Sequence, residues 1–177
     1  MEKFKYVFLF LLITLLSFSK DISSIKDMTL EVEEKLTLNG EIKKSEYILK
    51  YIKPDFIRKE IISPELNKGE IYIYNSEKKM VYLPLFDQVS ESKLEDGEDD
   101  IAQTINYILK EKSKLVEGKI RLKNGGIVEL KKIKNFSGYD LPEYIIIYDG
   151  DIKVAELKVK GYKINTNLDR EALSLHD

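Results

Sequence analysis

The sequence contains no cysteine, no tryptophan and a single histidine, His176, beside the last residue. The lack of cysteine excludes disulfides, a cysteine nucleophile and lipid attachment to a cysteine behind an N-terminal signal. There is no recognisable spacing of a nucleophile and a base, so an enzyme would have to rely on paired carboxylates. No cofactor or metal site is predicted, and a chain so poor in catalytic residue types is expected to work by binding.

The charged residues lack a dominant sign. Twenty-nine basic and 31 acidic side chains give a net charge of −2, and both signs are mixed along the chain. There is no basic patch, so nucleic acid is not an expected partner.

Long apolar runs are absent except at the N-terminus. Lys3 and Lys5 precede an apolar run over residues 6–18, and small residues follow near position 19. This order is typical of a secretory signal peptide, because the run is short for a membrane span. An uncleaved N-terminal anchor is the alternative. We expect a signal peptide at residues 1–19, one domain over residues 20–177, and a net charge of −3 after cleavage.

Alternating apolar and polar residues, typical of half-buried strands, dominate the remaining chain. Asn39-Gly40 and Asp149-Gly150 separate such runs and predict hairpin turns, while Pro54 and Pro64 end strands. Strands are expected at residues 28–38, 41–53, 56–62, 71–74, 80–85, 119–123, 127–133, 143–148 and 152–159, with a final extended stretch through Tyr162 and Ile164.

One amphipathic helix is predicted after an acidic run at residues 95–100, which supplies its cap. Its apolar stripe consists of Ile101, Ile105, Ile108, Leu109 and Leu115. A short second helix is expected within residues 20–27.

These elements predict an α+β fold that is mostly β. A long antiparallel sheet with so little helix to cover it must curl into an incomplete barrel. A space left between the sheet and the helices would form an apolar ligand cavity. A fully packed core of sheet against helix is the alternative.

Three stretches, taken together and in this order, resemble the LolA-like family of periplasmic lipoprotein carriers. The first is YILKYIKPDFIRKEI (residues 47–61), in which a basic residue precedes a proline between two strands. The second is NKGEIYIYN (67–75), a strand led by glycine, and the third runs from LPEYIIIYDGD to KGYKINTNLD (141–169). The resemblance covers nearly all of the chain after residue 20.

The resemblance implies a curved sheet closed by helices over an apolar cavity. It also implies a periplasmic carrier that shields lipoprotein acyl chains, or other lipids, and transfers them toward the outer membrane. Its partners would be acylated lipoprotein or lipid and transient inner- and outer-membrane transport proteins, and we expect a monomer. The sequence departs from the carriers by supplying one clear helix between residues 86 and 118, where they have more lid.

In that family the basic residue before the proline points into the cavity and helps to hold the helical lid. Lys53 occupies this position, although lysine lacks the planar five-donor fork of arginine. A solvated lysine at a strand end is the alternative. The residues expected to contact a ligand are Leu49, Tyr51, Lys53, Ile57, Ile61, Ile105, Ile108 and Leu109.

A second hypothesis assigns a different function to the same fold. An envelope module that senses lipid, or that pairs with a partner chain through an exposed edge strand, would have a similar sequence.

Overall fold

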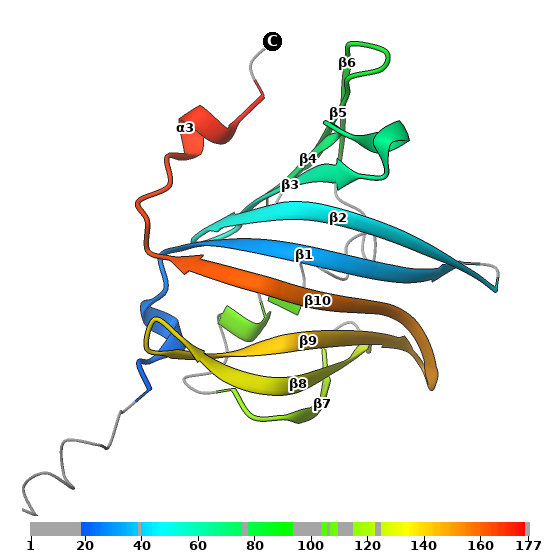
Figure 1. Cartoon of the computed structure of the whole chain (residues 1–177). Coiled ribbons are helices and arrows are strands. Elements are labelled where there is room, and N and C mark those ends of the chain that lie inside the picture. The colour runs from blue at the N-terminus through cyan, green and yellow to red at the C-terminus, as the bar shows by residue number, and fades with distance from the viewer. Residues whose placement is uncertain are drawn as a thin grey trace, which may run out of the picture.

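The computed structural model describes residues 19–38, 40–75, 78–93, 104–105, 107–109, 115–122 and 125–175. Ten strands form one antiparallel sheet in the order β6-β5-β4-β3-β2-β1-β10-β9-β8-β7 (Figure 1). The strands are β1 (Asp27–Leu38), β2 (Glu41–Ile52), β3 (Phe56–Ser63), β4 (Ile71–Tyr74), β5 (Lys78–Leu83), β6 (Gln88–Lys93), β7 (Gly118–Arg121), β8 (Ile127–Phe136), β9 (Tyr139–Asp149) and β10 (Ile152–Ile164). The sheet is not closed, because β6 and β7 remain separate edges. This is the predicted mostly-β fold with an incomplete barrel.

The described helices are few and short. They are the 3-10 turns η1 (Ile22–Ser24) and η2 (Glu65–Asn67) and the C-terminal helix α3 (Arg170–Leu173). Residues 104–105 and 107–109 are also helical, within the stretch where the long helix is predicted. Ile101 and the predicted acidic cap lie outside the described residues.

The first and last strands meet in the middle of the sheet. β1 pairs along its length with β2 on one side and with β10 on the other. The pairing of Leu38 with Glu41 confirms the hairpin predicted at Asn39-Gly40. Gly40 has φ +80°, which glycine adopts without the steric cost that a Cβ would bring.

Three differences from the predicted strands have local causes. The strand β6 was not predicted, because all six of its residues are exposed and carry no apolar alternation. β8 and β9 reach further than predicted, to Phe136 and back to Tyr139, around a turn in which Ser137 and Gly138 both have positive φ. The final extended stretch is the continuation of β10, beyond a register shift opposite residues 31 and 32 of β1.

The core lies on the concave face of the sheet. Alternate side chains of β1, β2, β8, β9 and β10 are buried there, and Ile22 and Ile25 of the N-terminal segment join the same cluster. Within the part of the chain that the structure describes, no helix is long and apolar enough to cross a membrane.

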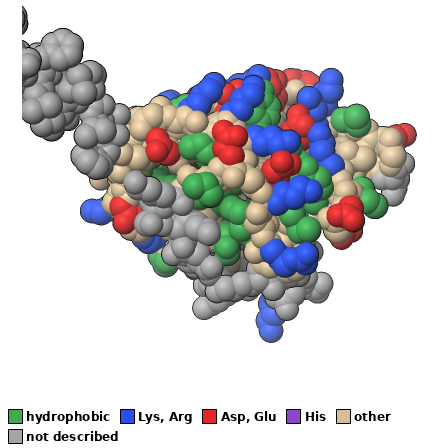
Figure 2. Space-filling view, turned by 90° about the horizontal axis from the view of Figure 1, so that it is seen from below, with side chains coloured by type: hydrophobic (Ala, Val, Ile, Leu, Met, Phe, Trp, Pro, Cys, Tyr) green, Lys and Arg blue, Asp and Glu red, His purple; other side chains and the backbone are tan. Residues whose placement is uncertain are grey.

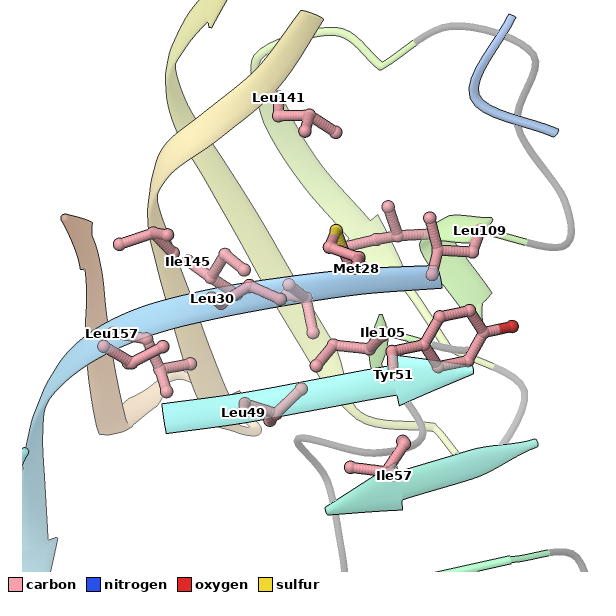
Figure 3. Close-up of a cluster of buried hydrophobic side chains, with 14 of the residues drawn as sticks. Met28, Leu30, Leu49, Tyr51, Ile57, Ile105, Leu109, Leu141, Ile145 and Leu157 are labelled. Carbon is pink, nitrogen blue, oxygen red and sulfur yellow. The ribbon is translucent and has the colours of Figure 1, made fainter. Parts of the chain in front are cut away.

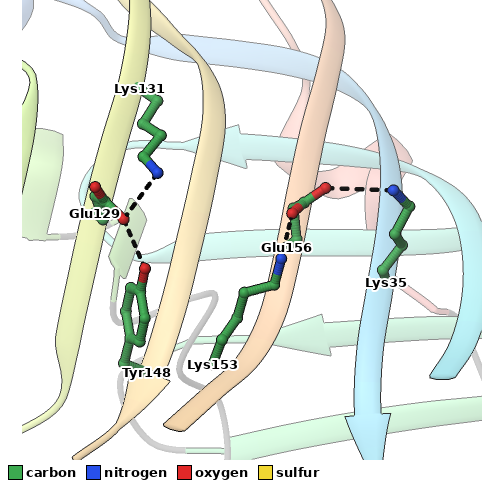
Figure 4. Close-up of polar contacts among 6 residues, drawn as sticks. All are labelled: Lys35, Glu129, Lys131, Tyr148, Lys153 and Glu156. Atoms are coloured by element: carbon green, nitrogen blue, oxygen red, sulfur yellow. Dashed lines mark hydrogen bonds and ion pairs between the residues drawn. The ribbon is translucent and has the colours of Figure 1, made fainter. Parts of the chain in front are cut away.

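The convex face carries ion pairs that bridge neighbouring strands. Glu156 of β10 accepts from Lys35 of β1 and from Lys153 of its own strand (Figure 4). On the same face Lys160 contacts Glu33 at 2.8 Å and Glu46 at 3.1 Å, which raises the pKa of Lys160. Figure 2 shows basic and acidic side chains interspersed with hydrophobic ones on another side of the molecule, without a patch of one sign. Exposed pairs of this kind stabilise a fold little.

Candidate ligand-binding site

The concave face offers a continuous apolar surface. Leu30 of β1 pairs with Leu49 of β2 and with Tyr162 of β10, so their side chains lie on one face across three neighbouring strands. Figure 3 shows Leu30 and Leu49 together with Ile105 and Leu109 of the helical residues that cover this face. The surface therefore has the chemistry that an acyl chain needs, which is apolar contact without fixed polar partners.

Two small cavities remain between the covering helical residues and the sheet. Their volumes are about 10 Å³ and about 20 Å³. Both are lined by Leu30, Ile105 and Ile145, and the first also touches Tyr47 and Leu49. Each has about the room of one water molecule, so Ile105 and its neighbours nearly fill the concavity in this state.

Seven of the eight predicted ligand residues lie in one buried cluster. Four come from the sheet and three from the covering helical stretch. They are Leu49, Tyr51, Ile57, Ile61, Ile105, Ile108 and Leu109. The structure brings these residues together, whether they serve a ligand or only the core.

Lys53 lies apart from this cluster. β2 ends at Ile52, and Lys53 is an exposed residue of the following turn. Its ammonium donates a hydrogen bond of 2.8 Å to the carbonyl oxygen of Ser23 in η1. Its backbone N–H donates to the carbonyl of Lys26 at 2.8 Å. Lys53 therefore ties the end of β2 to the N-terminal segment that covers one end of the core.

Sequence reasoning missed an ion pair on the concave face. Lys59 of β3 stands directly opposite Leu49, between Ile57 and Ile61, and its ammonium lies 3.4 Å from the carboxylate of Glu34 on β1. The signal was present in the sequence, because alternation places residues 57, 59 and 61 on one face of a strand. A charged residue between two buried isoleucines on the same face points to a polar site in the wall.

The C-terminal motif GYKINTNLD (residues 161–169) links the end of β10 to the start of β1. β10 ends at Ile164, and the chain turns away at Asn165, which has φ +54°. The buried carboxylate of Asp27 accepts three hydrogen bonds, from the N–H groups of Thr166 and Asn167 and from the Thr166 hydroxyl, at 2.7 to 3.1 Å. The Asn165 side chain accepts from the Lys26 N–H at 2.7 Å. The motif thus holds the start of β1 against the end of β10 through these hydrogen bonds.

Within the described ranges, no three histidine or acidic side chains lie close enough together to hold a metal ion. His176 lies outside the described residues.

Burial raises the pKa of Tyr51 to about 12, and the nearby charge of Asp55 adds to the shift. Below pH 10 this phenol is neutral in both the folded and the unfolded chain. Between about pH 10 and pH 12 it ionises only in the unfolded chain, so its contribution to stability is lost as the pH rises.

We expect the Tyr51→Phe variant to lose less stability at alkaline pH than the parent protein. At pH 11 the difference should be about 1 kcal/mol relative to pH 8. Urea unfolding at both pH values measures it, and the other tyrosines cancel because both proteins carry them. An identical pH dependence in the two proteins would show that Tyr51 ionises normally.

No protein-family model matches the sequence, and no curated protein matches it. Solved structures, in contrast, share its fold. A LolA superfamily protein from Nitrosomonas europaea superposes with a TM-score of 0.60 at 11% identity, covering 86% of this chain and 91% of that one. A domain from Vibrio parahaemolyticus, described as a candidate outer membrane lipoprotein-sorting protein, gives 0.60 at 12% identity over 84% and 89%.

A DUF1329 family protein from Desulfovibrio piger gives a TM-score of 0.62 at 11% identity, covering 86% of this chain and 93% of that one. At such low identity these likenesses bear on the fold and not on the cargo. The chain has a LolA-like fold, as the three sequence stretches predicted.

Proposed function

We propose that this protein is a carrier that binds the acyl chains of lipoproteins, or of other lipids, against the concave apolar face and transfers them toward the outer membrane. The main support is the apolar wall, which is the concave face of the sheet, together with the helical residues that cover it. Among the described residues of this covering stretch, Thr104 is the only buried polar one. The chain shares its fold with a domain described as a candidate lipoprotein-sorting protein and with a LolA superfamily protein, and this likeness supports the same role.

Loading requires the covering helical residues to leave the wall. The two cavities are far too small for an acyl chain, so the chain must take the place of Ile105, Ile108 and Leu109. Each buried methylene stabilises the complex by about 0.8 kcal/mol. The ligand replaces apolar contacts that the helix already makes, so the net gain is smaller than this sum. A small net gain suits a carrier that must also release its cargo.

This role needs export, so we propose that residues 1–19 act as a cleaved signal peptide and that the mature domain works in the periplasm. A monomer would then exchange cargo with transport proteins of the inner and outer membranes. Detection of a mature N-terminus near residue 20 in a periplasmic fraction tests this part.

Open edge strands favour a second role, an envelope lipid-sensing or protein-interaction module. All six residues of β6 are exposed, and its outer edge is unpaired among the described residues. A partner that binds this edge and is unaffected by added lipid would support that role over the carrier.

An engineered disulfide tests the carrier directly. Leu30 on the sheet and Ile105 on the covering stretch line both cavities, and the parent chain has no cysteine, so a Leu30→Cys/Ile105→Cys variant can form only one intramolecular disulfide. We expect the oxidised variant to lose binding of an apolar fluorescent probe by at least about tenfold, and the reduced variant to recover it.

The single Ile105→Cys variant is the control for lost packing, and mass spectrometry confirms the disulfide. Equal probe binding by the oxidised and reduced forms would show that the helical stretch does not open. Absence of probe binding and of copurified lipid in the parent protein would overturn the carrier role itself.

A further inference from the structure

The ion pair between Glu34 and Lys59 lies at one end of the apolar wall. Glu34 lies two residues after Val32 on β1, so both side chains are on the same face of the strand. Glu34 pairs with Ser45 of the neighbouring strand β2. The Lys59 ammonium lies 4.1 Å from the centroid of the Tyr47 ring. Tyr47 in turn lines the first apolar cavity. The charged pair and the apolar wall therefore share Tyr47 as a common boundary.

Both charges are largely withdrawn from water. The Glu34 side chain is 9% exposed and the Lys59 side chain 18%. A buried ion pair of this kind adds little stability over apolar residues, but removing one partner leaves an uncompensated charge and is strongly destabilising. Any group that enters this place must therefore satisfy both charges.

Both charges also have bonding capacity left. The Ser45 hydroxyl and the Lys59 ammonium both contact Oε2 of Glu34, at 3.0 and 3.4 Å, and within the described chain no hydrogen bond uses Oε1. Besides the Tyr47 ring, the three N–H groups of Lys59 have one hydrogen-bond acceptor among the described residues, at a long distance. The carboxylate can accept further hydrogen bonds, and the ammonium can donate further ones.

A polar cleft reaches the Glu34 member of this pair from the outside. It has a volume of about 370 Å³ and is lined by Glu34, Ser45 and Ser63. Glu33, Lys35, Lys44 and Glu46, which alternate onto the other face of β1 and β2, complete the lining, and Lys59 lies behind Glu34. This volume falls within the range of small-ligand sites. The contacts therefore run from the polar cleft to Glu34, then to Lys59, then to the Tyr47 ring and the apolar wall, which matches the order of a headgroup and its acyl chains.

We infer that this site binds the headgroup of a zwitterionic lipid, with its ammonium on Glu34 and its phosphate on Lys59. Because the ion pair is neutral, a headgroup with one charge would give the buried site a net charge, whereas a zwitterion keeps the site neutral and offers an opposite charge to each member. Phosphoethanolamine has this chemistry, and its amine can donate hydrogen bonds to the free carboxylate oxygen.

This inference rests on the proposed acyl-chain binding, and the test separates the two. Three lipids with identical short acyl chains compete with an apolar fluorescent probe: phosphatidylethanolamine, phosphatidylglycerol and diacylglycerol. For the parent protein we expect phosphatidylethanolamine to displace the probe at concentrations about tenfold lower than the other two. Glu34→Gln and Lys59→Met should each remove this preference and leave displacement by diacylglycerol unchanged.

Glu129→Gln and Lys131→Met are matched controls, because they break an ion pair of 3.2 Å on the other face, and they should keep the preference. If a single variant does not fold, the double variant Glu34→Gln/Lys59→Met leaves no unpaired charge and gives the same readout. Equal displacement by the three lipids in the parent, or an unchanged preference in the variants, overturns the headgroup site. Failure of every lipid to displace the probe would instead count against acyl-chain binding.

Discussion

The Leu49→Glu variant should fail to fold cooperatively, whereas Ile105→Glu should keep its sheet. Leu49 lies on β2 with paired strands on both sides and is 1% exposed, so a charge there has no route to water. The Lys59 ammonium opposite is already paired with Glu34, so a second carboxylate would compete for it and give the buried site a net negative charge. Burying this charge costs several kcal/mol, and about 2 kcal/mol of apolar burial is lost as well. Together these approach the whole stability of a typical domain.

Ile105 is buried equally well but belongs to the covering stretch. The carrier role requires this stretch to leave the apolar wall. A charge at position 105 can then reach water, because the helical stretch moves away from the sheet. We therefore expect Ile105→Glu to retain the strand signal in far-UV circular dichroism and to bind more of an apolar dye. Unfolding of both variants to the same extent would mean that the helical stretch is an inseparable part of the core.

Removal of the Asp27 carboxylate should cost about 2 to 3 kcal/mol of unfolding free energy, because a buried carboxylate that accepts three hydrogen bonds is lost, although its donors lie on exposed residues that water can reach. Asp27 is 4% exposed, and its partners Thr166 and Asn167 lie at the far end of the chain. Denaturant unfolding of Asp27→Ala measures the loss directly.

Asp21→Ala is the matched control for the hydrogen bonds between Asp27 and the C-terminal motif. Asp21 is an exposed carboxylate of the same segment that accepts from the Ser23 N–H at 2.8 Å, so its loss should cost much less stability than the loss of Asp27. Similar losses at the two positions would show that the motif at residues 161–169 does not hold the termini together.

The predicted strands were mostly right where one face of the strand is buried and polar residues mark its ends. Alternation around Leu49 and Tyr51 and the turn at Asn39-Gly40 carry this information locally. β6 was missed because its order comes only from hydrogen bonding to β5, which leaves no apolar pattern in its own residues.

The sequence predicted the apolar residues of the candidate site but not the position of its charged side chains. The apolar positions 49, 51, 57 and 61 follow from strand periodicity, and 105, 108 and 109 follow from helix periodicity. Lys53 was expected to point into the cavity from the end of a strand over residues 41–53, but β2 ends one residue earlier, and the Lys53 side chain reaches Ser23 instead.

The sequence by itself determined that this protein is a mostly-β domain without cysteine and with one histidine beside its last residue, because composition and alternation are local properties. Only the tertiary structure decided that Glu34 meets Lys59 beside Tyr47 and that Asp27 holds Thr166. Both contacts join residues of different strands or opposite ends of the chain. Their distances depend on the curvature and register of the whole sheet, which no short stretch of sequence encodes.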